Sequence, residues 1–242
     1  MDLKKQKIEN FLERKIKRYK FLKSGFSSNE NYLVDDNIHV HFTNNNIDHE
    51  NEIKAYKLYG TKIFKMQNGN FAKEFFEGRN PNFENKKELK KVIKEIKKFH
   101  KLPNHNFDEH GINVYLQSTK IDSKLILEFK SLISLYELEP KVLIHGDINP
   151  TNIIIKENVK LIDFEWVRKG PAIIDFASII AFSNADINFV CKETNIDKNK
   201  LISFTRLVLI HTLMWCEKQN SILSNKLRLE VNKKLKEILT KL

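Results

Sequence analysis

The sequence is poor in the residues that build covalent or highly flexible frameworks. Its 242 residues include only two cysteines, seven glycines and five prolines. Cys191 and Cys216 lie far apart and lack the close spacing of metal ligands. The sequence therefore excludes a disulfide scaffold and predicts two buried thiols in a reducing cytosol. The scarcity of glycine and proline also argues against long disordered linkers.

Long apolar runs are missing as well. No stretch approaches the roughly 18 apolar residues that a membrane span requires, and the N-terminus lacks the apolar centre of a secretory signal. We therefore expect no membrane span and a cytoplasmic protein. With 41% hydrophobic residues and no internal repeat, the chain can form one sizeable core or two modest lobes.

Acidic residues are outnumbered by basic ones, which gives a formal net charge of +11 at pH 7. The excess is mostly lysine, interleaved with glutamate along the chain. This pattern is typical of a solvated basic surface, so we expect no specific nucleic-acid partner, although such a surface attracts nucleotides and other anions. The segment from Met1 to about Lys23 has apolar residues at near-helical spacing and predicts an amphipathic helix that packs on its own domain.

The most informative stretch runs from His145 to Glu165. Asp147 follows a short apolar run that predicts a buried strand, and its carboxylate would be free on the next loop to accept a hydroxyl proton. Asn152 offers an amide oxygen of the kind that Mg²⁺ prefers. Residues 153–162 predict a hairpin that brings Asp163 back beside Asn152. One base and two oxygen ligands in one pocket indicate phosphoryl transfer.

This stretch, H-G-D-x-x-x-x-N followed by I-D-F-E, resembles the catalytic signature of the aminoglycoside phosphotransferase and choline kinase superfamily, relatives of the protein kinases. The resemblance implies that Asp147 is the catalytic base, that Asn152 and Asp163 hold Mg²⁺, and that ATP is the phosphoryl donor. It assigns His145 to the catalytic group as a brace of the loop. Asp175 matches a scaffold aspartate that hydrogen-bonds this loop.

The N-terminal part resembles the nucleotide-binding half of the same superfamily. Ser27, Ser28 and Asn29 correspond to the loop above the nucleotide phosphates, and Glu52 corresponds to the helix carboxylate that pairs with a cation on the third strand. At the position of that cation this chain has His41. A neutral histidine holds phosphate poorly, whereas a protonated one could serve. A catalytically impaired nucleotide-binding protein therefore stays open as an alternative.

The resemblance also implies an α+β fold with two lobes, as in protein kinases. A small antiparallel-sheet N-lobe is expected over residues 1–77 and a mainly helical C-lobe over residues 78–242. Phe75 and Phe76 resemble the hinge between such lobes, where they would flank the adenine base. Monomer and homodimer remain equally open.

The acceptor is expected to be a small alcohol. Trp166 and Trp215 fall where choline kinases place aromatic rings around a quaternary ammonium, and Glu165 is assigned to the same acceptor site. Thr212 stands where a further aromatic of that cage is expected. Choline is the first expectation, and ethanolamine, an aminoglycoside or a vitamin alcohol stay open as alternatives.

Overall fold

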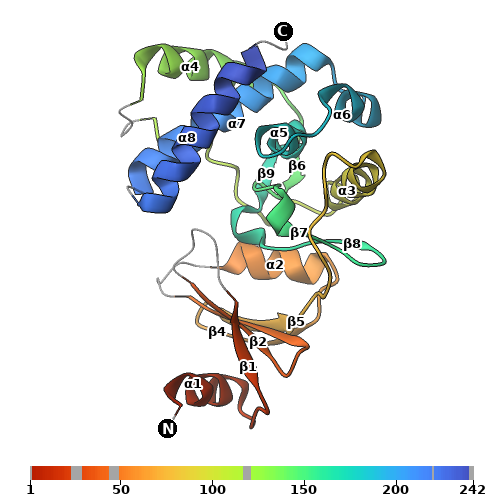
Figure 1. Ribbon diagram of the computed structural model, residues 1–242, viewed down its shortest axis with the longest axis vertical. Coiled ribbons are helices and arrows are strands. Elements are labelled where there is room, and N and C mark those ends of the chain that lie inside the picture. The colour runs from red at the N-terminus through yellow and green to blue at the C-terminus, as the bar shows by residue number, and fades with distance from the viewer. Residues whose placement is uncertain (1, 23–28, 44–48, 117–120, 220, 240–242) are drawn as a thin grey trace. The chain divides into compact units, whose positions relative to one another are not determined.

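The computed structural model describes residues 2–22, 29–43, 49–116, 121–219 and 221–239 (Figure 1). The chain forms two compact units, Met1–Gly78 and Arg79–Leu242. The division falls one residue after the predicted boundary. The first unit holds an antiparallel sheet and the second is mainly helical, which confirms the predicted α+β class.

In the residues that the structure describes, the first unit is a five-stranded sheet with two helices. Its strands follow the order β1-β2-β3-β5-β4, and every neighbouring pair is antiparallel. Consecutive hairpins therefore build most of the sheet, and α2 is inserted between β3 and β4. The elements are α1 (Leu3–Leu12), β1 (Tyr19–Leu22), β2 (Glu30–Val34), β3 (Ile38–Phe42), α2 (Glu50–Leu58), β4 (Ile63–Gln67) and β5 (Asn70–Glu74).

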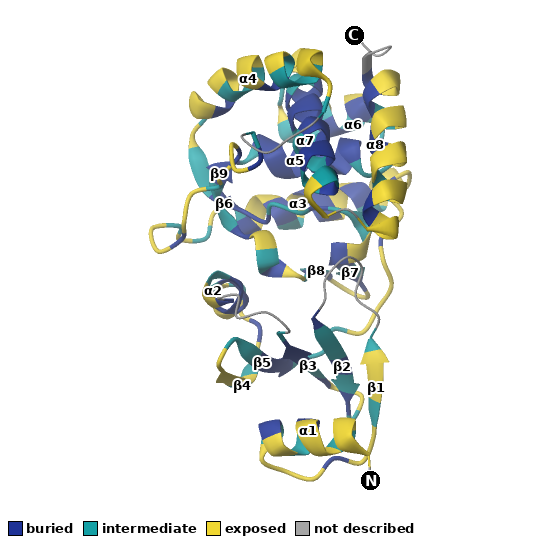
Figure 2. Ribbon diagram, turned by 90° about the vertical axis from the view of Figure 1, so that its left-hand side faces the viewer, coloured by how far each residue is buried: buried dark blue, intermediate teal, exposed yellow. Residues whose placement is uncertain are grey.

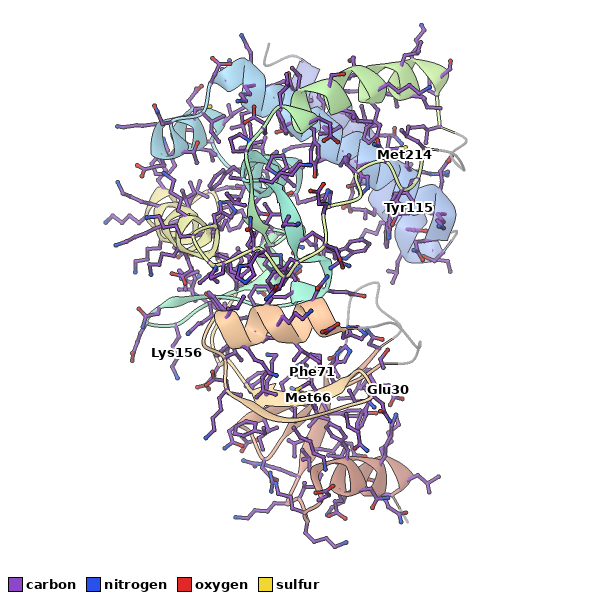
Figure 3. The ribbon with its side chains drawn as sticks, turned by 180° about the vertical axis from the view of Figure 1, so that it is seen from behind. Glu30, Met66, Phe71, Tyr115, Lys156 and Met214 are labelled. Carbon is purple, nitrogen blue, oxygen red and sulfur yellow. The ribbon has the colours of Figure 1, made fainter. Side chains whose placement is uncertain are left out.

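The two faces of this sheet are covered by different helices (Figure 2). On one face, Ile8 and Phe11 of α1 join a buried cluster with Val40 and Phe42 of β3. On the other face, Phe71 of β5 lies beneath α2 (Figure 3), with its ring 5.7 Å from that of Tyr56. Because side chains alternate along a strand, β3 sends its apolar residues to α1 and its histidines to α2.

The predicted N-terminal helix to Lys23 is wrong in length. The observed helix ends at Leu12, and Glu13 takes the left-handed conformation with φ of 54°. The Glu9 carboxylate then accepts the backbone N–H of Ile16 at 3.1 Å and holds the chain after the turn. Tyr19 belongs to β1. Sheet pairing with β2 overrides the helical spacing of these apolar residues.

The second unit is a helical core that carries two short antiparallel ribbons. α5 and α8 both pack on α7, and α4 joins the same group through a salt bridge between Arg206 and Glu128, with Nη2 and Oε2 2.6 Å apart (Figure 1). The helices and strands are α3 (Lys86–Phe99), α4 (Ser123–Glu137), β6 (Lys141–Ile144), β7 (Ile153–Ile155), β8 (Val159–Leu161), β9 (Arg168–Pro171), α5 (Ile173–Ala181), α6 (Ile187–Thr194), α7 (Lys198–Gln219) and α8 (Ile222–Leu239).

The two ribbons hold the segment that the sequence marks as catalytic. β6 pairs with β9 and β7 pairs with β8, so residues 141–171 fold back on themselves twice. The backbones of Arg79 and Ile155 exchange hydrogen bonds of 2.8 and 3.1 Å, which attaches the start of the unit to this hairpin. Among the described helices, none is long and apolar enough to span a membrane.

Candidate active site

Asp147 stands on the loop that follows β6, as the sequence predicts. Its side chain is half-buried and accepts two amide hydrogen bonds. The Asn152 amide nitrogen donates to Asp147 Oδ2 at 2.7 Å, and the Asn149 amide nitrogen donates to Asp147 Oδ1 at 3.2 Å. These bonds fix the direction of the carboxylate while it remains able to accept a further proton.

Asn152 is oriented by the same contacts. Its amide nitrogen also donates to the backbone oxygen of Asp147 at 3.0 Å. Since the NH₂ group is committed to Asp147, the amide oxygen is the atom left for a cation. A buried amide oxygen beside a carboxylate is the donor set of a hard divalent cation.

The predicted hairpin brings Asp163 toward Asn152. Ile153 of β7 is paired with Leu161 of β8, and the next backbone contact runs from Ile162 N–H to the carbonyl oxygen of Asn152 at 3.0 Å. Asp163 follows directly, exposed and in the left-handed region with φ of 64°. Asn152 and Asp163 therefore stand at the same end of one ribbon.

A buried aspartate holds the Asp147 loop through backbone hydrogen bonds. Asp175 of α5 accepts the backbone N–H groups of His145 and Gly146, each at 2.9 Å, and lies 2.8 Å from Nε2 of His100. Burial raises the pKa of Asp175, but the hydrogen bond and charge of His100 and the backbone N–H of His145 outweigh it and leave the pKa below the usual range. Asp175 is thus positioned as an ionised scaffold.

His145 also holds the loop that carries Asp147. Its side chain is fully buried, with Nε2 2.9 Å from the carbonyl oxygen of Ile162, and Nδ1 accepts the backbone N–H of Asp147 at 3.3 Å. The hydrogen bonds therefore link the loop of Asp147 to the ribbon of Asp163. This geometry makes His145 a positioning residue.

The backbone of Trp166 passes very close to Gly146, the residue before Asp147. Gly146 has a φ of 79°, and a Cβ there would stand 2.5 Å from the carbonyl oxygen of Trp166. Only glycine fits this conformation and this approach. The contact puts the Trp166 backbone against the catalytic loop, and the side chain is 37% exposed. Glu165, beside it, is half-buried.

Trp215 lies half-buried on α7. One turn earlier on that helix, His211 stands among aromatic rings, with its centroid 5.2 Å from Tyr115 and 5.9 Å from His110. Tyr115 and the neighbouring Met214 are labelled in Figure 3. Burial lowers the pKa of His110 to about 4 and that of His211 to about 3, so both rings are neutral. Sequence reasoning missed these two histidines, because nothing near them forms a motif.

In the first unit, Glu52 and His41 are both buried, and they share one face of the sheet with α2. Burial outweighs the raising effect of Glu52 and, with smaller contributions from the charges of His49 and Lys73, lowers the pKa of His41 to about 4. His41 is therefore neutral at pH 7. Ser27 and Ser28 lie outside the described residues, and Asn29 is buried directly before β2.

Lys73 is the cation that sequence reasoning missed on this face. It lies on β5 opposite His39 of β3, so the two side chains point to the same side of the sheet. Its side chain is 4% exposed, and Nζ lies 4.6 Å from the ring of Tyr56 and 5.2 Å from that of Phe76. The alternation Phe71, Ala72, Lys73 is the only sequence signal, and it identifies a face only once the strand pairing is known.

Phe75 and Phe76 follow β5 as half-buried residues. The backbone N–H of Phe75 donates to the carbonyl oxygen of Asn37 at 2.9 Å, and Phe76 contacts Lys73 as above. Both residues lie at the end of the first unit, immediately before its boundary at Gly78.

Comparison with known proteins bears on the second unit. Residues 88–191, which include the catalytic loop and Asp175, match the model of the phosphotransferase enzyme family. The match spans less than half of the chain, and over this part the chain is similar to that family. The predicted superfamily and the predicted class of activity, phosphotransfer by a small-molecule kinase, are confirmed. No curated protein matches the chain in sequence.

Solved structures of phosphotransferases share the fold. The choline kinase LicA from Streptococcus pneumoniae has a TM-score of 0.76 at 15% identity, covering 97% of this chain and 98% of that one. An ethanolamine kinase from Plasmodium vivax has a TM-score of 0.67 at 18% identity, with coverages of 93% and 84%. The ADP-bound aminoglycoside phosphotransferase APH(2'')-Ib has a TM-score of 0.68 at 15% identity, with 97% of both chains covered. These likenesses confirm the kinase-like fold and leave the acceptor undecided.

Proposed function

We propose that this phosphotransferase moves the γ-phosphoryl group of ATP to the hydroxyl of a small amino alcohol, with choline as the first candidate. The observation that carries the proposal is the 2.7 Å hydrogen bond by which Asn152 orients the Asp147 carboxylate, at the ribbon end that also carries Asp163. A general base and two oxygen ligands are the parts that such a transfer needs.

In the proposed reaction, Asp147 orients the acceptor hydroxyl and accepts its proton as the oxygen attacks the phosphorus. Asn152, through its amide oxygen, and Asp163 would hold Mg²⁺, which when bound neutralises charge on the phosphate oxygens. His145 and Asp175 hold the loop through hydrogen bonds to its backbone. Their contribution is the alignment of Asp147.

The residues proposed for the nucleotide lie in the first unit. Asn29, Ser27 and Ser28 would contact the phosphates, and Phe75 and Phe76 would flank the base. Because His41 is neutral, we assign the positive charge expected beside Glu52 to Lys73, which lies on the same face of the sheet. This assignment also counts against an impaired enzyme, since a buried cation is present.

For the acceptor, Trp166 is the better supported of the two tryptophans. Its backbone contacts Gly146, next to the proposed base, and its ring is partly exposed. An aromatic face near the base suits a cationic amino alcohol. Trp215 and Glu165 complete the proposed acceptor site.

The test is ADP release from ATP and Mg²⁺ with choline, ethanolamine and an aminoglycoside as separate acceptors. We expect turnover with choline or ethanolamine that is lost in Asp147→Ala. Turnover with the aminoglycoside alone would replace the proposed acceptor. A melting-temperature increase with ATP and Mg²⁺ but no transfer to any of the three would instead indicate a nucleotide-binding protein without this activity.

A further inference from the structure

Three metal-ligand side chains meet in the first unit, on the sheet face that α2 covers. His41 comes from β3, His49 directly precedes α2, and Glu52 lies in the first turn of that helix. They are 6%, 3% and 5% exposed. One ligand atom from each lies within 4.8 Å of the other two. The His49 Nδ1 and Glu52 Oε2 atoms are 2.9 Å apart, and the two imidazole centroids are 5.0 Å apart.

The protonation of His41 is fixed by Asn31. In the pairing of β2 with β3, Asn31 stands opposite His41, and its Oδ1 atom lies 3.0 Å from His41 Nδ1. A carbonyl oxygen only accepts, so Nδ1 carries the hydrogen. In a neutral ring Nε2 then bears a lone pair. That atom is buried and has no hydrogen-bond partner in the parts of the chain that the structure describes.

The orientation of this ring is also set in advance. The ring of His41 stacks on Phe71 with centroids 4.7 Å apart and planes inclined by 10°. Histidines that bind metals usually donate their second ring N–H to an oxygen, which fixes both tautomer and direction. The contact with Asn31 has this form. An unpartnered buried lone pair is otherwise costly, and a cation would satisfy it.

We propose that His41, His49 and Glu52 form a binding site for a divalent transition-metal ion, with Zn²⁺ as the ion that best fits the ligands. Two imidazoles and one carboxylate favour zinc over magnesium or calcium, which prefer all-oxygen sites. Three protein ligands leave a fourth position for water. Ligand atoms on tetrahedral zinc lie about 3.3 Å apart, so the three side chains draw together slightly on binding.

The charges around the cluster both support and oppose a cation. Glu52 supplies the negative charge. Lys73 and His39 face the same side of the sheet; Lys73 is positive, and burial and Lys73 lower the pKa of His39 well below its usual value. The site belongs to the first unit alone and does not depend on the proposed phosphate transfer.

The test uses the full-length protein, stripped with a chelator and titrated with Co²⁺ and Zn²⁺. We expect saturable binding of one ion per chain, a visible Co²⁺ spectrum of the four-coordinate type that Zn²⁺ abolishes, and a higher melting temperature with Zn²⁺. His41→Gln and Glu52→Gln are each expected to weaken binding at least 10-fold, since loss of an outer partner alone typically costs 10- to 100-fold.

His39→Gln is the matched control. His39 lies on the same strand and the same face as His41, and its Nε2 is 2.9 Å from the same Asn31 oxygen, but it is outside the cluster. This variant is expected to bind Zn²⁺ like the unaltered protein. Far-UV circular dichroism of each metal-free variant checks folding.

Two results would overturn the proposal. One is the absence of saturable one-to-one binding to the folded, unaltered protein. The other is equal binding by His41→Gln and Glu52→Gln, which would put the ion elsewhere. If both variants fail to fold, the Co²⁺ spectrum of the unaltered protein decides: a weak six-coordinate spectrum indicates adventitious surface binding and contradicts the site.

Discussion

Buried histidines have different surroundings in the two units. In the second unit, both ring nitrogens of His145 are engaged, one by the carbonyl of Ile162 and the other by the backbone of Asp147. In the first unit, His41 is held at Nδ1 by Asn31, while its Nε2 lacks a partner among the described residues. One ring completes a network that already exists, whereas the other presents an unused acceptor.

This difference distinguishes a histidine that positions a loop from one that can bind a ligand. A side chain whose hydrogen bonds are all satisfied within the protein can hold a loop, but it has nothing left with which to hold a ligand. A buried acceptor without a partner costs free energy unless something outside the chain satisfies it. The catalytic loop is therefore complete as folded, and the face beneath α2 is where an added ion or nucleotide would have the larger effect on stability.

The largest effect is expected for a substitution in the second unit that tests the proposed base. Asp147→Ala removes the proposed base, and proton transfer by a positioned side chain contributes about 10²- to 10⁴-fold to rate. We expect turnover to fall by that factor or below detection, with the melting temperature nearly unchanged. ADP release with the best acceptor measures it.

The control for this substitution is Glu157→Gln. Glu157 is an exposed carboxylate in the turn between β7 and β8, so its replacement changes the net charge by the same amount as Asp147→Ala. It is expected to leave turnover as it was. Near-normal turnover in Asp147→Ala would remove the assignment of the base, and equal losses in both variants would indicate an effect of charge alone.

Asp175→Asn is next in size and concerns stability. The carboxylate serves two backbone N–H groups and His100, and removing one partner from such a buried group costs about 3–5 kcal/mol. Both tryptophans lie in Arg79–Leu242, so urea denaturation followed by tryptophan fluorescence reports on that unit alone. A loss below about 1 kcal/mol would show that the amide braces the loop equally well.

The pH dependence of this effect has a definite sign. The pKa of Asp175 is lowered in the folded protein, so its contribution is present above the unfolded pKa of about 3.9. The contribution is lost as the pH falls through the folded value. The difference in unfolding free energy between Asp175→Asn and the unaltered protein should therefore narrow below about pH 4, and a constant difference would contradict the linkage.

Lys73→Met tests the first unit. If Lys73 supplies the cation for the nucleotide, its loss removes a charge-assisted interaction of about 1.5–3 kcal/mol. We expect ATP affinity, measured by calorimetry with Mg²⁺, to fall about 10- to 100-fold. Lys73→Arg keeps the charge and should retain part of the affinity, while Lys20→Met, at an exposed position of β1, should have no effect. An unchanged ATP affinity in Lys73→Met would show that Lys73 does not supply the cation for the nucleotide.

The catalytic loop was predictable because its geometry is local. A strand, a loop and a hairpin within residues 141–163 put Asn152 against Asp147 and place Asp163 at the same ribbon end as Asn152, and the spacing along the chain carries that information. The brace by Asp175 was predictable only through resemblance, because it connects residues separated by a whole ribbon. The predicted acceptor remains a proposal for the same reason: its residues come from distant helices.

The first unit was less predictable because its chemistry depends on strand pairing. Lys73 shares a face with His41 only because of the register of β3 and β5, which pairs residues that are far apart in sequence. Asn31 fixes the tautomer of His41 through the register of β2 and β3. The N-terminal helix was overestimated because apolar spacing alone does not show where a chain turns to join a sheet.

The smallest expected effect is that of replacing Trp166. This substitution tests whether the Trp166 ring contacts the acceptor. A cation over an aromatic face gains about 0.5–2 kcal/mol, so Trp166→Ala should raise the KM for choline by about 2- to 30-fold with little change in kcat. Trp166→Phe retains an aromatic face and should recover most of the loss. An equal rise in KM for ATP, or a fall in kcat with KM unchanged, would instead assign the residue to the geometry around Gly146, because the Trp166 backbone lies against that loop.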